Sequence, residues 1–229
     1  MSKDVILGSG VLMSRTARIF FIIFFIISSA FPLAAQANHV RIRTFAGMEP
    51  YGRLSTRNWG SGNMTKKWNT SYGFTPGLEF YIGLNDLLEV GAGFKWQLDR
   101  QVYRTGGSSD ETFAFIPVYL ALRFNIMDIE GVDMHAILRL GYAFFDASQE
   151  FRNIWIDENG ALVSTDGGMY GAVSLGVTIL LLDRPEWGID YSMDAGYAYY
   201  GAAGRNVSDE TSPISYQSME VDFSLDWRF

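Results

Sequence analysis

Long segments in which apolar and polar residues alternate restrict the fold of this 229-residue chain more than any other feature. In residues 87–99, LLEVGAGFKWQLD, the apolar Leu88 and Val90 have one parity and the charged Glu89 and Lys95 have the other. Successive side chains of a β-strand point to opposite faces, so period two is the pattern of a strand with one apolar face. A helix would need apolar residues three and four positions apart, and this segment lacks that spacing.

Eight segments of the chain carry this alternation, and together they predict an all-β protein. Each is about 10–14 residues long, whereas globular strands most often have about 5–6 residues and a tilted strand needs about 9–11 to cross a bilayer. We therefore expect an eight-stranded antiparallel up-and-down transmembrane β-barrel. The segments are residues 39–49, 74–84, 87–99, 116–126, 133–145, 169–181, 187–200 and 219–229.

The connections between these segments alternate between short and long. Three short ones are built from turn residues: Asn85-Asp86, MDIEGV at 127–132 and LDRPE at 182–186. Short turns on one rim, long loops on the other and an even number of strands are typical of barrels in the bacterial outer membrane. The long connections are predicted over residues 50–73, 100–112, 146–168 and 201–215.

The residue types on the two faces indicate which one points outward. A secreted lipocalin-type barrel would alternate in the same way, but with its apolar face around a ligand. The polar face here is rich in glycine and serine, which fits a narrow lumen where small residues leave room for a few charged ones. Eight strands enclose an interior that side chains just fill, so we expect no open pore. The apolar face, expected to meet lipid, carries Phe80, Trp96, Phe124, Trp187, Tyr197 and Tyr199.

The charged residues of the polar face predict an ion-pair network inside the barrel. A lipid-facing Arg or Lys costs about 2–4 kcal/mol at the bilayer midplane, so these side chains belong in the lumen, where opposite charges pair. We expect their role to be structural. They are Glu79, Glu89, Lys95, Arg123, Arg139, Asp190, Asp194, Glu220 and Asp222.

The first 37 residues predict an export signal. The unbroken apolar run at residues 19–27 follows Arg15 and Arg18 and leads to the sequence AQA at 35–37. A positive segment, a short apolar segment and an A-x-A site are the three parts of a cleaved secretory signal peptide. An uncleaved membrane anchor is the alternative, but the 15 residues from 19 to 33 fall short of the ~20 that a spanning helix needs.

Cleavage after Ala37 would leave a barrel domain of residues 38–229, with 15 basic and 24 acidic residues and a net charge of −9. This acidic balance gives no electrostatic support for nucleic-acid binding. The chain has no cysteine, which excludes a disulfide scaffold and a cysteine-ligated metal site. Met13 is a second candidate for the translation start, because a start there puts both arginines at the front of a compact signal.

The export signal, the eight alternating segments and the last strand, Val221 to Phe229, resemble small bacterial outer-membrane β-barrels of the OmpA transmembrane-domain and OmpX type. The resemblance is architectural, so no functional residue follows from it. It implies the bacterial outer membrane, contact with outer-membrane lipid and lipopolysaccharide, a monomer and no cofactor. The final Phe229 is similar to the signal that the outer-membrane insertion machinery reads. The implied function is a structural, adhesive or surface-binding role in the cell envelope.

An enzymatic role is the alternative, because small barrels of this class include lipid A deacylases and acyltransferases. Such an enzyme needs a nucleophile, a base and an orienting group within hydrogen-bond reach. His135 has the inward parity, but its neighbours in the sequence include no Ser or Thr, and Ser174 or Ser192 would approach it only across the lumen. We therefore predict no catalytic residue, with the lipid A-modifying enzyme as the second hypothesis.

Metal binding has weaker support. Glu220, Asp222 and Asp226 share one face of the last strand, where carboxylates meet lumen arginines more often than cations. The run Asp157-Glu158-Asn159-Gly160 lacks the twelve-residue pattern of a calcium loop. The sequence predicts no metal site.

The first long connection is basic and contains two tryptophans, with no acidic residue over positions 53–72. Basic side chains near the outer surface would hold lipopolysaccharide phosphates or an anionic polysaccharide. The alternative is an ordinary solvated loop. The candidate binding residues are Arg57, Trp59, Lys66, Lys67 and Trp68.

Overall fold

The computed structural model describes residues 39–57, 65–103, 109–129, 131–153, 162–205 and 211–229. The predicted signal peptide, its cleavage site and both candidate start positions lie outside these residues. Within them, no helix is long and apolar enough to cross a membrane.

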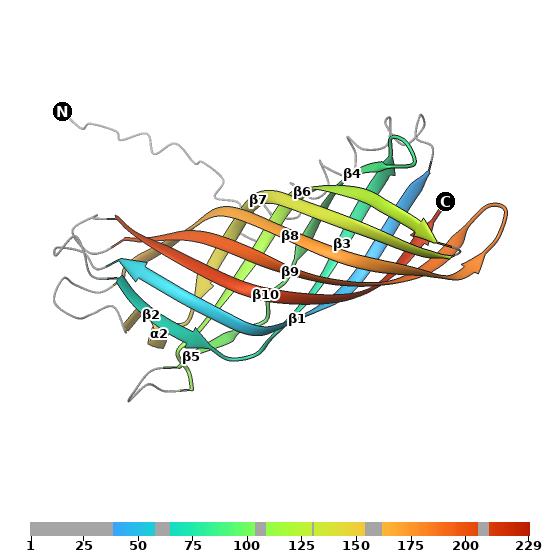
Figure 1. The fold of residues 1–229 in the computed structure, drawn as a ribbon. Helices are drawn as coiled ribbons and strands as arrows, with labels where there is room; N and C mark the ends of the chain where they lie inside the picture. The colour runs from blue at the N-terminus through green and yellow to red at the C-terminus, as the bar shows by residue number, and fades with distance from the viewer. Residues whose placement is uncertain (1–38, 58–64, 104–108, 130, 154–161, 206–210) are drawn as a thin grey trace, which may run out of the picture. The chain divides into compact units, whose positions relative to one another are not determined.

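Ten antiparallel strands and one short helix make up the described chain (Figure 1). The strands are β1 (Val40–Arg57), β2 (Thr65–Thr70), β3 (Gly73–Gly83), β4 (Leu88–Lys95), β5 (Arg100–Tyr103), β6 (Thr112–Ile129), β7 (Val132–Ala147), β8 (Ser164–Asp183), β9 (Gly188–Arg205) and β10 (Thr211–Arg228), and the helix is α2 (Gln149–Asn153).

Eight of the ten strands close into a ring, as the alternation predicts. The ring runs β1-β3-β4-β6-β7-β8-β9-β10, and β10 pairs again with β1. At the seam, the Val40 amide donates to the Phe229 carbonyl at 3.0 Å and the Phe229 amide donates to the Val40 carbonyl at 2.8 Å. Closure removes the free edges that an open sheet would expose to hydrocarbon.

The two extra strands, β2 and β5, continue the second and third strands of the ring. β2 pairs with the outer part of β1, and the chain passes through Ser71 and Tyr72 into β3. β5 follows β4 after residues 96–99 and pairs with both β2 and β6. The eight predicted strands are therefore confirmed, with two of them broken into two pieces.

The strands are longer than the apolar pattern predicts, so the predicted long connections are wrong in extent. Five strands have 18 or more residues, and β1 reaches Arg57 where a loop was expected from residue 50. The reason is that alternating hydrophobicity marks only the part of a strand that faces lipid. Beyond it the backbone ladder continues, with polar side chains on the outside.

The three short turns lie where turn residues predict them. The β6–β7 turn uses Gly131 at φ 88°, in the left-handed region that glycine tolerates best. In the β3–β4 turn, the Asn85 side-chain oxygen accepts hydrogen bonds from the Leu87 and Leu88 amides, both at 2.9 Å. The first and last residues of the ring, Val40 and Phe229, lie on this same rim.

The outer surface of the ring carries a belt of exposed apolar side chains. One cross-strand row runs through Leu138, Val173, Tyr197, Met219 and Tyr51, each joined to the next by backbone pairing across five strands. These side chains are between 36% and 56% exposed. A continuous apolar face of this size is unsuited to water and matches hydrocarbon, so the lipocalin-type arrangement is excluded.

The lumen contains large aromatic side chains as well as charges, which corrects the expectation that bulky rings lie outside. We name as the aromatic cluster six buried rings at the long-loop end that pack with centroids 4.7–6.2 Å apart. Glycines on the facing strands make the space: a Cβ on Gly52 would collide with Tyr216. The six are Phe113, Phe115, Phe145, Phe151, Tyr200 and Tyr216.

Changing Phe229 to Ala should separate barrel stability from membrane insertion. The Phe229 side chain is 59% exposed, while its backbone forms the seam hydrogen bonds. Phe229→Ala should therefore refold in detergent like the wild type, as read from heat-modifiable migration on gels, but accumulate less folded protein in cells.

Deleting residue 229 removes the seam hydrogen bonds as well and should impair both assays. Equal accumulation of wild type and Phe229→Ala in cells would show that the terminal ring carries no insertion signal.

Candidate functional site

The nine charged residues expected in the lumen are all buried there, each no more than 4% exposed. They come from six strands of the ring, and most contact at least one opposite charge. We name as the charged cluster these nine together with Arg41, Arg43, His135 and Asp226, which share their inward parity.

Two cations organise the middle of the charged cluster. The Lys95 ammonium lies 2.6 Å from Glu220 Oε2 and 3.2 Å from Asp222 Oδ2. Arg139 Nε lies 2.6 Å from Glu79 Oε1, and Tyr119 donates a hydrogen bond to the same oxygen at 2.8 Å. Charge-assisted bonds of this kind offset part of the cost of taking both ions out of water.

At the short-turn end, Arg41 and Arg43 supply the cations that the sequence prediction missed. Arg41 binds Glu89 with two guanidinium nitrogens, both at 3.1 Å, and Asp190 at 3.0 Å. Arg43 contacts Asp194. The signal was present, since residues 40–45 read VRIRTF with both arginines on one parity.

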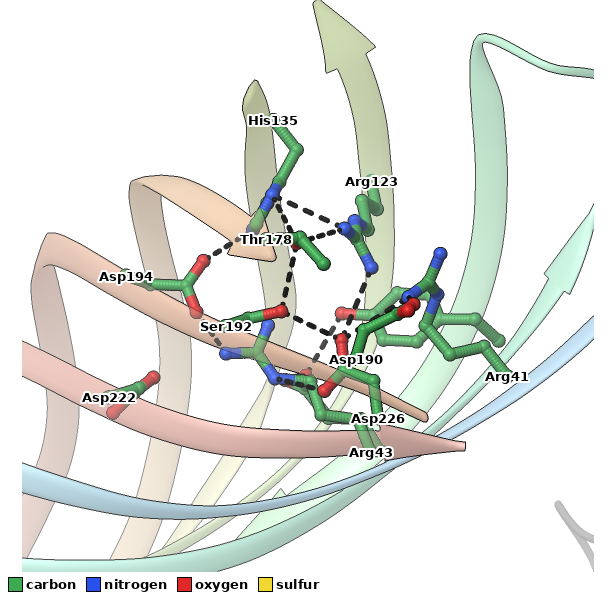
Figure 2. Close-up of polar contacts among 12 residues, drawn as sticks. Arg41, Arg43, Arg123, His135, Thr178, Asp190, Ser192, Asp194, Asp222 and Asp226 are labelled. Atoms are coloured by element: carbon green, nitrogen blue, oxygen red, sulfur yellow. Dashed lines mark hydrogen bonds and ion pairs between the residues drawn. The ribbon is translucent and has the colours of Figure 1, made fainter. Parts of the chain in front are cut away.

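His135 lies at the centre of a chain of hydrogen bonds (Figure 2). Its Nε2 is 2.6 Å from Asp194 Oδ1, and its Nδ1 is 3.2 Å from Thr178 Oγ1. Thr178 Oγ1 is 2.9 Å from Ser192 Oγ, which donates to Asp226 at 3.0 Å. Sequence analysis missed Thr178, because this residue lies 43 residues from His135 in the chain and meets it only through β7–β8 pairing.

The Asp194–His135–Thr178 arrangement has the order of a carboxylate, a base and a hydroxyl, but its surroundings suit a structural role. Arg123 donates to Thr178 Oγ1 at 2.8 Å and lies 3.3 Å from His135 Nδ1. Because Arg123 donates to Nδ1, this nitrogen acts as an acceptor. In a neutral imidazole the proton is then on Nε2, which donates it toward Asp194. His135 and Thr178 are each only 1% exposed, so an incoming acyl group would have to displace the Arg123 guanidinium.

A second polar group lies at the long-loop end of the lumen, around the Glu49 carboxylate. Glu49 accepts hydrogen bonds from Thr75 at 2.7 Å, from Tyr216 at 2.9 Å and from Gln97 at 3.1 Å. Arg100, at the start of β5, lies 3.1 Å from the same carboxylate. Sequence reasoning missed Arg100 because it assigned positions 100–112 to a loop. It missed the others because only the register between distant strands brings them together.

Helix α2 places the aromatic side chain of Phe151 at this end. Ser148 precedes the helix, and its hydroxyl accepts a hydrogen bond from the Phe151 amide at 3.0 Å, which is the geometry of a helix N-cap. The Phe151 ring is fully buried against Phe113 and Phe145. The described start of the third long connection, residues 146–153, therefore folds into the mouth of the barrel.

The predicted basic loop forms a hairpin on the outer end of the wall. β2 pairs with β1 so that Lys67 lies beside Ser55, Lys66 beside Thr56 and Thr65 beside Arg57. Lys67 is exposed on the outer face, whereas Trp68 is partly buried and packs against the lumen core. Trp59 lies outside the described residues.

The acidic residues considered for metal binding separate in the structure. Glu220 and Asp222 face Lys95, while Asp226 faces Arg41 and Arg123. The Asp157–Gly160 run lies outside the described part of the chain.

Removing the Lys95 cation should destabilise the barrel strongly. Lys95→Met removes the cation that the buried Glu220 and Asp222 share. It should lower the free energy of unfolding by about 3 kcal/mol, measured by urea unfolding in lipid vesicles with tryptophan fluorescence. Adding Glu220→Gln to Lys95→Met should restore part of the loss, because Asp222 keeps Arg139 at 3.6 Å.

Arg184→Met, in an exposed short turn, is the control and should change the free energy of unfolding by less than about 0.5 kcal/mol. Equal stabilities of Lys95→Met and this control would contradict a structural role for the charged cluster.

Comparison with known proteins finds no matching protein-family model and no matching curated protein. Solved structures do match. The outer membrane protein OprG from Pseudomonas aeruginosa is 13% identical, with a TM-score of 0.56 and a match over 84% of this chain and 96% of that one. The outer membrane protein AlkL, determined in lipid bilayers, is 13% identical, with a TM-score of 0.50 over 84% of this chain and 90% of that one. The chain thus has the fold of small bacterial outer-membrane β-barrel proteins.

Proposed function

We propose that this chain is a non-enzymatic barrel of the bacterial outer membrane that is closed to solutes and binds anionic partners with its outer end. The burial of the charged cluster carries this proposal. Its four arginines and Lys95, each no more than 4% exposed, occupy the space that a solute path would need. With the lumen filled, the exposed ends of the strands and loops are the surfaces left for recognition.

Two successive layers support a closed lumen. The charged cluster fills the short-turn end and the middle, and its ions hold one another across the barrel, as Arg41 does with Asp190 and Arg43 with Asp194. The aromatic cluster and the Glu49 group fill the long-loop end. A solute would have to separate buried ion pairs, each of which is costly to break.

The burial of His135 supports a non-enzymatic role over the lipid A-modifying alternative. A nucleophile must reach the reacting carbonyl, and the base must reach the nucleophile. Thr178 and Ser192 are enclosed by Arg123 and Asp226, so their hydroxyls are used inside the network. Lipid acyl chains, in contrast, contact the outer wall.

The β1–β2 hairpin supports a surface-binding role. Arg53 and Lys67 are exposed on its outer face, and Arg57 and Lys66 lie at its end. Clustered cations attract phosphate, sulfate or carboxylate groups and raise the rate of encounter with them. The structural and adhesive roles implied by the fold are compatible with such a surface.

The lumen proposal predicts that liposomes containing the protein swell in isosmotic arabinose no faster than liposomes without protein. Phe151→Ala removes one ring of the aromatic cluster but leaves the charged cluster intact. The lumen of this variant should therefore stay closed as well. Sugar-driven swelling by the wild type would refute the closed lumen, and swelling by Phe151→Ala alone would assign closure to the aromatic cluster.

The hairpin proposal predicts salt-sensitive binding of a soluble sulfated polysaccharide such as heparin. Lys66→Gln together with Lys67→Gln should weaken binding about thirtyfold, since each surface cation contributes about 1 kcal/mol. Replacing both lysines by arginine keeps the charge and should preserve binding. Unchanged affinity of the glutamine variant, measured by surface plasmon resonance at low salt, would end this proposal.

A further inference from the structure

A groove of about 520 Å³ lies on the outside of the barrel wall at the long-loop end. It crosses four strands, β8, β9, β10 and β1, and its floor is made of small residues. One cross-strand row runs through Ser55, Ser215 and Gly201, and Gly201 faces an irregularity of β8 at Gly168 and Met169. The volume falls within the range of about 300–1,000 Å³ that is typical of small-molecule sites.

The register of the strands places this groove just beyond the apolar belt. The belt row contains Tyr51, Met219 and Tyr197. The groove row lies about four residues further along β10 and β9, and the polar Gln217 lies between them. Aromatic side chains at the edge of a membrane protein occupy the headgroup level. The groove therefore opens at the depth of lipid headgroups, above acyl chains that contact the belt.

Positive charge lies at one end of the groove. Lys67 is the cross-strand neighbour of Ser55, and Arg53 is two residues from Ser55 on the same outer face. Both are exposed, and no ion pair joins either to another described residue. At the opposite end, Asp166 is paired with Arg205 at 3.2 Å, so its charge is balanced.

The groove offers groups suited to a sugar. Ser55 and Ser215 can supply hydroxyls, and Tyr199 supplies an aromatic ring to the lining. Strand spacing of about 4.8 Å puts Gly201 about 14 Å from Lys67, a span that fits a sugar headgroup with a phosphate at one end. A soluble glycan would not need the adjoining apolar belt, whereas a lipid uses both.

We propose that this groove binds the phosphorylated sugar headgroup of an outer-leaflet glycolipid. The phosphate lies between Arg53 and Lys67, the sugar lies over Ser55, Ser215 and Gly201, and the acyl chains lie along Met219 and Tyr197. This inference rests on the proposed surface-binding function and names the ligand class of the same basic hairpin.

The experiment measures bisphosphorylated lipid A retained by the mature protein in phosphatidylcholine nanodiscs, using native mass spectrometry. Gly201→Phe fills the groove and should reduce retention at least tenfold. Ser215→Phe also fills the groove, from the neighbouring strand, and should reduce retention as much. It keeps the test valid if Gly201→Phe does not fold. Arg53→Gln removes a cation and should reduce retention about fivefold. The wild type should also retain lipid A without its phosphates weakly. This retention should be no greater than that of phosphorylated lipid A by Arg53→Gln.

Two controls separate the groove from general effects. Gly171→Phe also adds a ring to the outer face of β8, where an added Cβ would have its nearest neighbour at 3.5 Å, and should retain lipid A like the wild type. Arg184→Gln removes a cation at the opposite rim and should also retain lipid A like the wild type. Heat-modifiable migration confirms that each variant is folded.

Wild-type retention by folded Gly201→Phe and Ser215→Phe would overturn the groove proposal, and so would equal retention of lipid A without phosphates. If the lysine variants lose heparin while the groove variants keep lipid A, the hairpin function stands and the groove proposal fails. If heparin does not bind but the groove variants selectively lose lipid A, the glycolipid site stands and the soluble-glycan function fails.

Discussion

The closed ring of backbone hydrogen bonds is the constraint on which the rest of this structure depends. In hydrocarbon, each unpaired amide or carbonyl costs several kcal/mol, so a membrane-spanning sheet must have no free edge. The pairing of β10 with β1, from Arg41–Arg228 to Thr56–Ile214, meets this requirement over most of both strands, with one irregularity between Met48 and Tyr51. Strand number then sets the width of the interior, and eight strands leave space only for side chains.

That narrow interior explains why the charged cluster and the aromatic cluster coexist. Alternation sends every second residue inward, and a lumen built only from glycine and serine would be empty. Arg43, Lys95 and Arg139 fill it with long side chains whose charges must then be matched by carboxylates. Tyrosine serves both needs: the Tyr200 ring packs on Phe115, and its hydroxyl donates to Glu220 at 2.6 Å. Glycine provides the space, since a Cβ on Gly176 would collide with Asp194 and His135.

Sequence reasoning was accurate wherever parity alone decides the outcome. Glu89 and Lys95 point inward and Trp96 outward because a strand has only two faces. It was inaccurate where length decides, because polar residues above the membrane edge carry no hydrophobic signal; β1 and β10 therefore continue through positions assigned to loops, and Arg100 went unnoticed. It was silent on partners: Thr178 and Asp194 meet His135 from two different strands.

The amino-acid sequence by itself determined the all-β class, the eight-stranded ring, the short turns and which face of each strand meets lipid, because these follow from a local period of two. Only the tertiary structure decided which charges pair, that aromatic rings pack together at the long-loop end, and that small residues of β1, β8, β9 and β10 join into one groove beside Arg53 and Lys67. These features depend on register between strands distant in the chain. A shift of register by two residues would keep every face and change every neighbour.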